Sequence, residues 1–249
     1  MKKILITNES IEIFGIKFLK EGYSSAIKKL SNGGFMVVPS APSLTIINSD
    51  EYYYKSLQAS DFAIADSGLM VLILKIFYKI NLEKLSGLAF LGLFFSDCSS
   101  SENSELFLVE PTEEDHGANK KYLNNIGVNY DSSFYYVAPI YKDIVIEDFD
   151  LLKQLEDQKP KKIIINLGGG IQEKLGYFLN THLSYKPAII CTGAAIAFLS
   201  GQQANIPDWG DRYYLGWLFR CISNPRRFVP RYLGSIKLIF MLMGCSVEK

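Results

Sequence analysis

Short apolar runs alternate with longer amphipathic segments along most of this chain, which predicts strand–helix units. The predicted strands are 11–16, 35–38, 62–65, 105–109, 133–137, 161–167 and 188–192. The predicted helices are 21–30, 43–49, 51–58, 69–80, 116–125, 148–157, 172–180 and 193–200. The helix at 69–80 is apolar on nearly every side, so we expect it to be buried. Together these elements predict an α/β fold, a Rossmann-like and mainly parallel sheet with helices on both faces.

The pattern changes after residue 204, where Trp, Tyr and Arg follow one another at helical spacing. We therefore predict an α/β catalytic domain at 1–204 and a C-terminal helical appendage at 205–249. The serine-rich stretch 96–103 is the one low-complexity spot, and we expect it to be a loop between two lobes.

Composition narrows the class of protein. The chain has 249 residues, of which 48% are apolar, enough for one α/β domain with a full core. Its 26 basic and 26 acidic residues balance, so overall charge does not favour nucleic acid as a partner. The balance is uneven along the chain, because 212–237 holds six basic residues and no acidic one.

Cysteine and histidine usage argues against a zinc site. The four cysteines form no CxxC pair and there are two histidines, which fits a reducing cytoplasm better than a disulfide framework. The N-terminus has no long apolar run before a cleavage site, so no signal peptide is predicted. No stretch reaches the about 18–20 uncharged apolar residues of a spanning helix.

Ligands of open α/β sheets bind beyond the carboxyl ends of the strands, and a glycine turn follows the strand at 161–167. Gly168, Gly169 and Gly170 can cradle a diphosphate with backbone N–H groups, or they can form a plain tight turn. Gln172 and Glu173 can hydrogen-bond a ribose or sugar, or Glu173 can simply favour the helix dipole. The spacing is not the GxGxxG of a dinucleotide-binding turn.

Three other strand ends carry candidate residues. Asp66 is placed to take a proton from an attacking hydroxyl, or to cap the helix that follows. Thr192 and Gly193 allow a base or sugar to approach closely, or allow close helix–strand packing. Ser40, in a Pro-Ser-Ala-Pro turn, can contact the ligand or serve only the turn.

The C-terminal segment mixes arginines with aromatic and apolar side chains. Arginines bind phosphates through two hydrogen bonds, and aromatic rings sit at the headgroup level of membranes, so the segment is typical of an element at the membrane interface. An oligomer interface, which is also rich in Trp, Tyr and Arg, is the alternative.

An ordered set of motifs resembles the WecG/TagA/CpsF glycosyltransferases and covers nearly the whole chain. The matching segments are FMVVPSAPSL at 35–44, ADSG at 65–68, EKLSGLAFLGLFF at 83–95, LGGGIQEK at 167–174, GAAIAFLSG at 193–201, PDW at 207–209, LGWLFR at 215–220 and NPRR at 224–227. Each motif is moderately specific, whereas the ordered set is specific.

The resemblance implies transfer of a sugar, often N-acetylmannosamine, from a UDP donor to an undecaprenyl-diphosphate-linked sugar, with inversion and without a bound metal or other cofactor. Asp66 matches the family's proposed general base, and Gln172 and Glu173 match its donor-side pair. Arginines that face the lipid diphosphate match Arg220, Arg226, Arg227 and Arg231. The protein would then be cytoplasmic, peripheral at the inner face of the membrane through its C-terminal segment, and able to form homo-oligomers.

This sequence departs from the family pattern mainly on the donor side. Ser67 replaces the first glycine of the DG motif, and Ser40 or Ala41 stands where the family has Asn. Gly170 stands where Pro-Lys is usual, and Glu110-Pro111 replaces a Gly-Gly pair. The donor sugar therefore stays open, and so do two other functions: a nucleotide-sugar-modifying enzyme such as an epimerase or NAD-dependent enzyme, and a non-catalytic membrane-attached scaffold.

Overall fold

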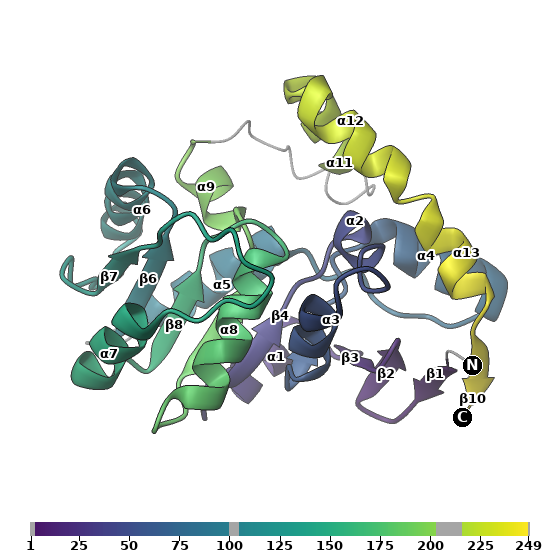
Figure 1. The fold of residues 1–249 in the computed structure, drawn as a ribbon, viewed down its shortest axis with the longest axis horizontal. Helices are drawn as coiled ribbons and strands as arrows, with labels where there is room; N and C mark the ends of the chain where they lie inside the picture. The colour runs from purple at the N-terminus through teal and green to yellow at the C-terminus, as the bar shows by residue number, and fades with distance from the viewer. Residues whose placement is uncertain (1–2, 100–104, 203–215, 249) are drawn as a thin grey trace.

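The computed structural model describes residues 3–99, 105–202 and 216–248, and over these residues the strands form one mixed, mostly parallel sheet (Figure 1). The order is β10-β1-β2-β3-β5-β4-β9-β8-β6-β7. The strands are β1 (Lys3–Ile6), β2 (Ser10–Ile13), β3 (Ile16–Leu19), β4 (Gly34–Val37), β5 (Phe62–Ala63), β6 (Leu106–Glu110), β7 (Tyr135–Val137), β8 (Lys162–Ile165), β9 (Ala188–Cys191) and β10 (Ser246–Glu248).

The helices connect these strands and cover both faces of the sheet, as predicted. They are α1 (Tyr23–Leu30), α2 (Ala41–Leu44), α3 (Glu51–Gln58), α4 (Gly68–Tyr78), α5 (Gly87–Ser99), α6 (Glu113–Asn125), α7 (Phe149–Gln158), α8 (Ile171–His182), α9 (Ala195–Leu199), α11 (Gly216–Ser223), α12 (Pro225–Gly234) and α13 (Lys237–Met243). In Figure 1, α3 and α8 lie in front of the sheet and α5 lies behind it.

The central strands are apolar runs because both of their faces are buried. Along β8, Ile163 and Ile165 point into one core cluster, whereas Ile164 points into the other. Buried side chains of α2, α3, α4, α7, α8 and α13 fill the first cluster, and those of α1, α5, α6 and α9 fill the second. The predicted α/β class and the mainly parallel sheet are therefore confirmed.

The amino-terminal end of the sheet differs from the prediction. The run 11–16 was expected to be one strand, but Phe14 and Gly15 both have positive φ (55° and 75°) and form a two-residue turn between β2 and β3. This turn type matches the twist of a hairpin, so the chain reverses and β1, β2 and β3 pair antiparallel. The buried positions shift from 11 and 13 to 16 and 18 across the turn. Apart from Glu12 and Gly15 the run is apolar, so it was predicted as one strand.

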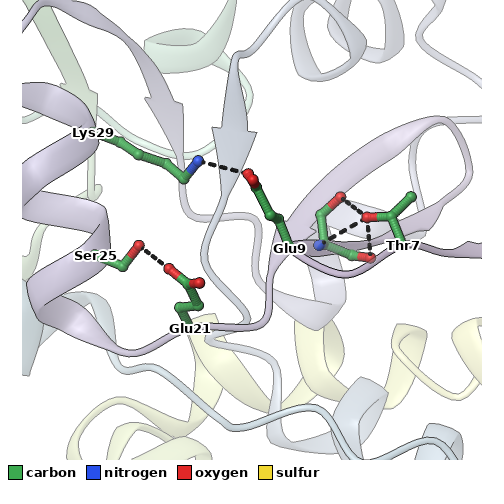
Figure 2. A network of polar contacts seen from close by, with 6 residues as sticks. Thr7, Glu9, Glu21, Ser25 and Lys29 are labelled. Carbon is green, nitrogen blue, oxygen red and sulfur yellow. Dashed lines mark hydrogen bonds and ion pairs between the residues drawn. The ribbon is translucent and has the colours of Figure 1, made fainter.

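A polar network ties this hairpin region to α1 (Figure 2). Lys29 forms an ion pair with Glu9 at 3.1 Å, and Ser25 donates a hydrogen bond to Glu21. Thr7 Oγ1 donates to the carbonyl oxygen of Ser10 at 3.0 Å, which closes the turn between β1 and β2. These side chains are solvent-exposed, so they contribute little to stability.

Two further helices differ from the prediction. The helix at 69–80 is α4, and the expectation that it is buried all round is wrong, because Leu72, Ile76 and Phe77 are exposed. An apolar composition does not tell a buried helix from one with an uncovered face. The stretch 96–103 was expected to be a loop, yet residues 96–99 complete α5, and 100–103 lie outside the described residues.

The described part of the appendage, 216–248, packs on the body of the protein. Leu238 and Leu242 of α13 are fully buried in the first core cluster, and the hydroxyl of Tyr78 in α4 donates to the carbonyl oxygen of Leu242 at 2.6 Å. The chain then ends in β10, which pairs parallel with β1, and Lys3 forms an ion pair with Glu248 at 2.6 Å. Among the described residues, none of the helices combines the length and the apolar composition that a membrane crossing requires.

Candidate functional site

Four neighbouring parallel strands bring the candidate residues to one edge of the sheet. The strands β5, β4, β9 and β8 lie side by side and run in the same direction. Asp66, Ser40, Thr192 and the turn 168–170 follow their carboxyl ends, so they lie at the same edge. After β4 the chain turns to the face that α2 covers, and after β9 it turns to the face that α9 covers. Such a switch point leaves a crevice in which open α/β sheets bind ligands.

The glycine turn is held from behind by Glu173. Gly170 has a φ of 95°, which favours glycine, and it directly precedes α8. A carboxylate oxygen of Glu173 accepts a hydrogen bond from the backbone N–H of Gly170 at 2.6 Å, and the other accepts from Nε2 of Gln172 at 3.0 Å. The side chain is only 1% exposed, and this burial raises its pKa, an effect that the nearby guanidinium of Arg231 opposes.

Gln172 joins the glycine turn to the next strand end. Its Oε1 accepts a hydrogen bond from the backbone N–H of Gly193 at 2.7 Å, and the residue is 2% exposed. Gly193 has a φ of 66°, and the buried hydroxyl of Thr192 has no hydrogen-bond partner among the described residues. The turns at 168–170 and 192–193 therefore form one braced wall. The predicted sugar contacts of Gln172 and Glu173 stay a prediction, and in this structure both side chains hold the backbone.

The opposite lip of the crevice comes from α2, and a residue of the appendage reaches it. The hydroxyls of Ser40 and Ser43 are 2.8 Å apart. A Cβ built on Gly169 would lie 3.1 Å from Oγ of Ser43 and 3.6 Å from Nη2 of Arg231. The fold thus places the Arg231 guanidinium, carried by α12, beside the glycine turn.

Asp66 is half-buried and faces the start of α5. Its Oδ1 accepts a hydrogen bond from the backbone N–H of Gly87 at 3.3 Å. The alternative that Asp66 caps the following helix is wrong, because the hydroxyl of Ser67 accepts from the backbone N–H of Met70 at 3.2 Å and is the cap of α4. The serine in the ADSG motif therefore takes the capping role, and the carboxylate of Asp66 does not have to.

The structure describes the side chains of two of the four predicted arginines. Arg231 lies at the glycine turn, and Arg226 is exposed near the start of α12. The side chains of Arg220 and Arg227 lie outside what the structure describes. Within the described ranges, no three His, Cys, Asp or Glu residues gather as potential metal ligands.

Sequence reasoning missed a row of polar side chains at neighbouring strand ends. Glu110 ends β6, Asn166 follows β8, and both side chains are buried. Asn119 of α6 donates a hydrogen bond to Glu110 at 3.0 Å, and burial raises the pKa of Glu110 to about 7. The sequence carries a signal for two of them, because Glu110 and Asn166 each end an otherwise apolar run.

Tyr53 was also missed, and no sequence pattern marks it. It is fully buried in α3 behind the site, and burial and the charge of Glu173 raise its pKa. Arg231 opposes this shift, which places the phenol close to the same group of charges.

Comparison with known proteins shows the family of the chain. Residues 11–249 match the glycosyl transferase WecG/TagA/CpsF family. The chain is similar to the N-acetylglucosaminyldiphosphoundecaprenol N-acetyl-beta-D-mannosaminyltransferase of Bacillus subtilis (strain 168), with 26% identity over 195 residues that cover 74% of this chain and 71% of the relative. Because the family match spans almost the whole sequence, the chain belongs to the WecG/TagA/CpsF family of glycosyltransferases.

Proposed function

We propose that this glycosyltransferase moves N-acetylmannosamine or a related hexose from a UDP-sugar to a sugar linked to polyprenyl diphosphate, with inversion and without a metal ion. The product would be an intermediate of a bacterial surface polysaccharide. The observation that carries the proposal is the position of Arg231, whose guanidinium approaches the backbone of Gly169 in a turn that leads into a helix N-terminus. Backbone N–H groups at a helix start and a guanidinium both favour a diphosphate.

The chemistry would be a single displacement at the anomeric carbon of the donor. The acceptor hydroxyl oxygen forms the new bond to that carbon, the bond from carbon to the diphosphate oxygen breaks, and UDP leaves with the electron pair. Asp66 takes the proton of the acceptor hydroxyl. Its position supports this role, because it lies at the carboxyl edge and Ser67 leaves its carboxylate free of the capping bond.

The leaving diphosphate gains negative charge as the bond breaks. The N–H groups of the turn 168–170 and the Arg231 guanidinium would offset this charge, which lowers the barrier most where the groups are already in place. The brace formed by Gln172 and Glu173 supports this role, because it fixes the turn before any ligand arrives. Ser40 and Thr192 would contact the donor from the two lips of the crevice.

The acceptor lipid requires a membrane, and the appendage would supply the contact. We assign the protein to the inner face of the cell membrane, held there through residues 205–249. In the described part of this segment, Arg226 and Lys237 are exposed next to exposed apolar side chains. Arginine and lysine near an apolar face are typical of peripheral attachment.

Turnover of a panel of UDP-sugars with a synthetic polyprenyl-diphosphate-linked sugar, in the presence of a metal chelator, tests the proposal. We expect product from one donor, with inverted anomeric configuration by NMR. Binding of UDP without product from any donor would reject the proposed acceptor. If UDP does not raise the melting temperature, the protein is a scaffold, and if NAD does so instead, it is a nucleotide-sugar-modifying enzyme.

A further inference from the structure

The helix α4 has apolar side chains on both of its sides. Met70, Val71, Ile73 and Leu74 are buried in the core. Leu72 and Ile76 on the other side are 52% and 60% exposed, and Phe77 near the carboxyl end of the helix is 55% exposed. A soluble surface seldom leaves three large apolar side chains together on one helix turn and a half, so this face marks a contact with something apolar.

The charges on α4 are of one sign. Lys75 lies among the exposed apolar residues, and Lys79 follows the helix as its C-cap; both are exposed. No acidic residue occurs between Asp66 and Glu83. Large apolar side chains flanked only by lysines favour an anionic lipid surface, since the ammonium groups meet phosphates while the apolar side chains enter the interface.

The neighbouring helices α12 and α13 repeat this pattern. From α12 through the N-cap of α13 to its end, exposed apolar residues recur at spacings of four and three: Val229, Leu233, Ile236, Phe240 and Met243. The opposite side of α13 is fixed to the body, because Leu238 and Leu242 are buried in the core. Lys237 is exposed, and no acidic residue occurs in 216–247.

The helices α4 and α13 are attached to each other at their carboxyl ends. Tyr78, the last residue of α4, donates through its hydroxyl to the carbonyl oxygens of Leu242 at 2.6 Å and Cys245 at 3.2 Å. Figure 1 shows α4 and α13 together at the side of the molecule where α12 rises over α2. A surface that docks α13 therefore has α4 within reach, although the two segments are more than one hundred and fifty residues apart in sequence.

We propose that α4 is a second membrane-contact element, which enters an anionic bilayer surface through Leu72, Ile76 and Phe77 and works beside α12 and α13. This inference rests on the proposed function in one respect, that the acceptor lipid lies in a bilayer. A second copy of the chain fits the face less well. In a two-fold interface the same patch meets itself, so Lys75 and Lys79 would face their own copies.

Docking of α4 would also explain how the lipid acceptor reaches the base. The helix begins at Gly68, two residues after Asp66, and its 11 residues span about 16 Å. Contact of α4 with the headgroup region would hold Asp66 within one short helix of the membrane. The acceptor diphosphate could then reach the crevice while its lipid tail stays in the bilayer.

Vesicle flotation of the full chain tests the proposal without any turnover. The probe is a vesicle of equal parts phosphatidylcholine and phosphatidylglycerol, compared with phosphatidylcholine alone. We expect the double substitution Ile76→Asn and Phe77→Ser to lower partition to the anionic vesicles at least about tenfold. Leu93→Ser is the matched control, because Leu93 is 49% exposed on α5, which packs on the opposite face of the sheet. This control should leave partition unchanged.

A second variant keeps the test valid if the double substitution impairs folding. Lys75→Glu reverses one exposed charge and leaves the apolar residues in place, and we expect it to weaken binding to anionic vesicles more than to neutral ones. Unchanged partition of both variants, with unchanged melting temperatures, would overturn the proposal. So would a change from dimer to monomer by light scattering without a change in partition, which would make the face an interface between copies.

The test separates this inference from the proposed function. If the parent protein binds vesicles through α4 but transfers no sugar, the proposed function fails and the membrane contact stands. If the parent transfers sugar equally well with and without vesicles and the α4 variants bind like the parent, the membrane contact fails alone.

Discussion

The two walls of the crevice are built in opposite ways. The wall formed by the turns 168–170 and 192–193 is braced by Gln172 and Glu173, whose side chains are almost fully buried and bonded to backbone N–H groups. The wall formed by the appendage presents Arg231, an exposed residue on a helix whose outer side is apolar and uncovered.

Because of this difference, the braced wall sets the position of the ligand, whereas the appendage wall supplies positive charge. Buried, hydrogen-bonded side chains keep one position whether or not a ligand is bound, so the braced wall can fix the place of the diphosphate. The appendage is held by the buried Leu238 and Leu242, by the hydroxyl of Tyr78 and by the pairing of β10 with β1, and its Arg231 stays exposed. We therefore expect the appendage wall to depend on salt and lipid, and the braced wall to depend on neither.

The largest effect should come from Asp66, the proposed base. Asp66→Asn keeps an oxygen for the backbone N–H of Gly87 but cannot accept a proton, so we expect turnover to fall by about 10²–10⁴-fold with an unchanged melting temperature. Steady-state assays with the functional donor measure it. Asp61→Asn is the control, because Asp61 accepts from the backbone N–H of Phe35 at the opposite edge of the sheet. Near-normal turnover of Asp66→Asn would end the assignment of the base.

The buried carboxyl group of Glu110 should make the free energy of unfolding depend on pH. Burial raises the pKa of Glu110 from 4.5 to about 7, so between these values the folded state holds a proton that the unfolded state has lost. The stability that protonated Glu110 contributes is therefore fully present below pH 4.5 and is lost as the pH rises through about 7. The loss is on the order of 3 kcal/mol.

Glu110→Gln removes the titrating group while keeping its shape, and we expect its unfolding free energy to change much less between pH 5 and 8. Urea unfolding at several pH values, followed by circular dichroism, measures the difference. Equal pH dependence of the parent and the variant would show that Glu110 does not titrate in this range.

The appendage wall should respond to charge and salt. Removal of the guanidinium by Arg231→Ala takes away charge-assisted hydrogen bonds, each of which contributes about 1.5–3 kcal/mol, so turnover should fall about 10- to 100-fold. Arg231→Lys should recover part of the loss, because it restores the charge but not the planar fork. Because salt screens the charge of Arg231, added salt should lower the parent's rate more than that of Arg231→Ala. If both variants keep parental rates, Arg231 does not contact the diphosphate.

The smallest effect concerns the attachment of the appendage. Tyr78→Phe deletes the hydrogen bonds to the carbonyl oxygens of Leu242 and Cys245, at a cost of about 1 kcal/mol. We expect faster hydrogen exchange in α13 with little change in the central strands. A uniform change across the whole chain would mean that the appendage and the body unfold as one unit.

Much of the fold follows from patterns that a single sequence carries. The apolar runs at β4, β6, β8 and β9 are buried on both faces, so period and composition locate them. The hairpin at Phe14 and Gly15 was missed, because the mostly apolar run 11–16 continues through the turn. The exposed face of α4 was missed for a related reason, since composition reports what a helix is made of and not what covers it.

For the site, too, one part follows from the sequence and another part only from the tertiary structure. The sequence by itself determined the family, the order of the strand-end motifs and the candidate residues Asp66, Gly168–Gly170 and Arg231, because these depend on local chemistry and spacing. Only the tertiary structure decided that Ser67 is the cap, that Gln172 and Glu173 brace two turns, and that Arg231 lies over Gly169. The physical reason is that each of these contacts depends on the exact placement of groups that the chain alone leaves free, and packing of the sheet and the appendage removes that freedom.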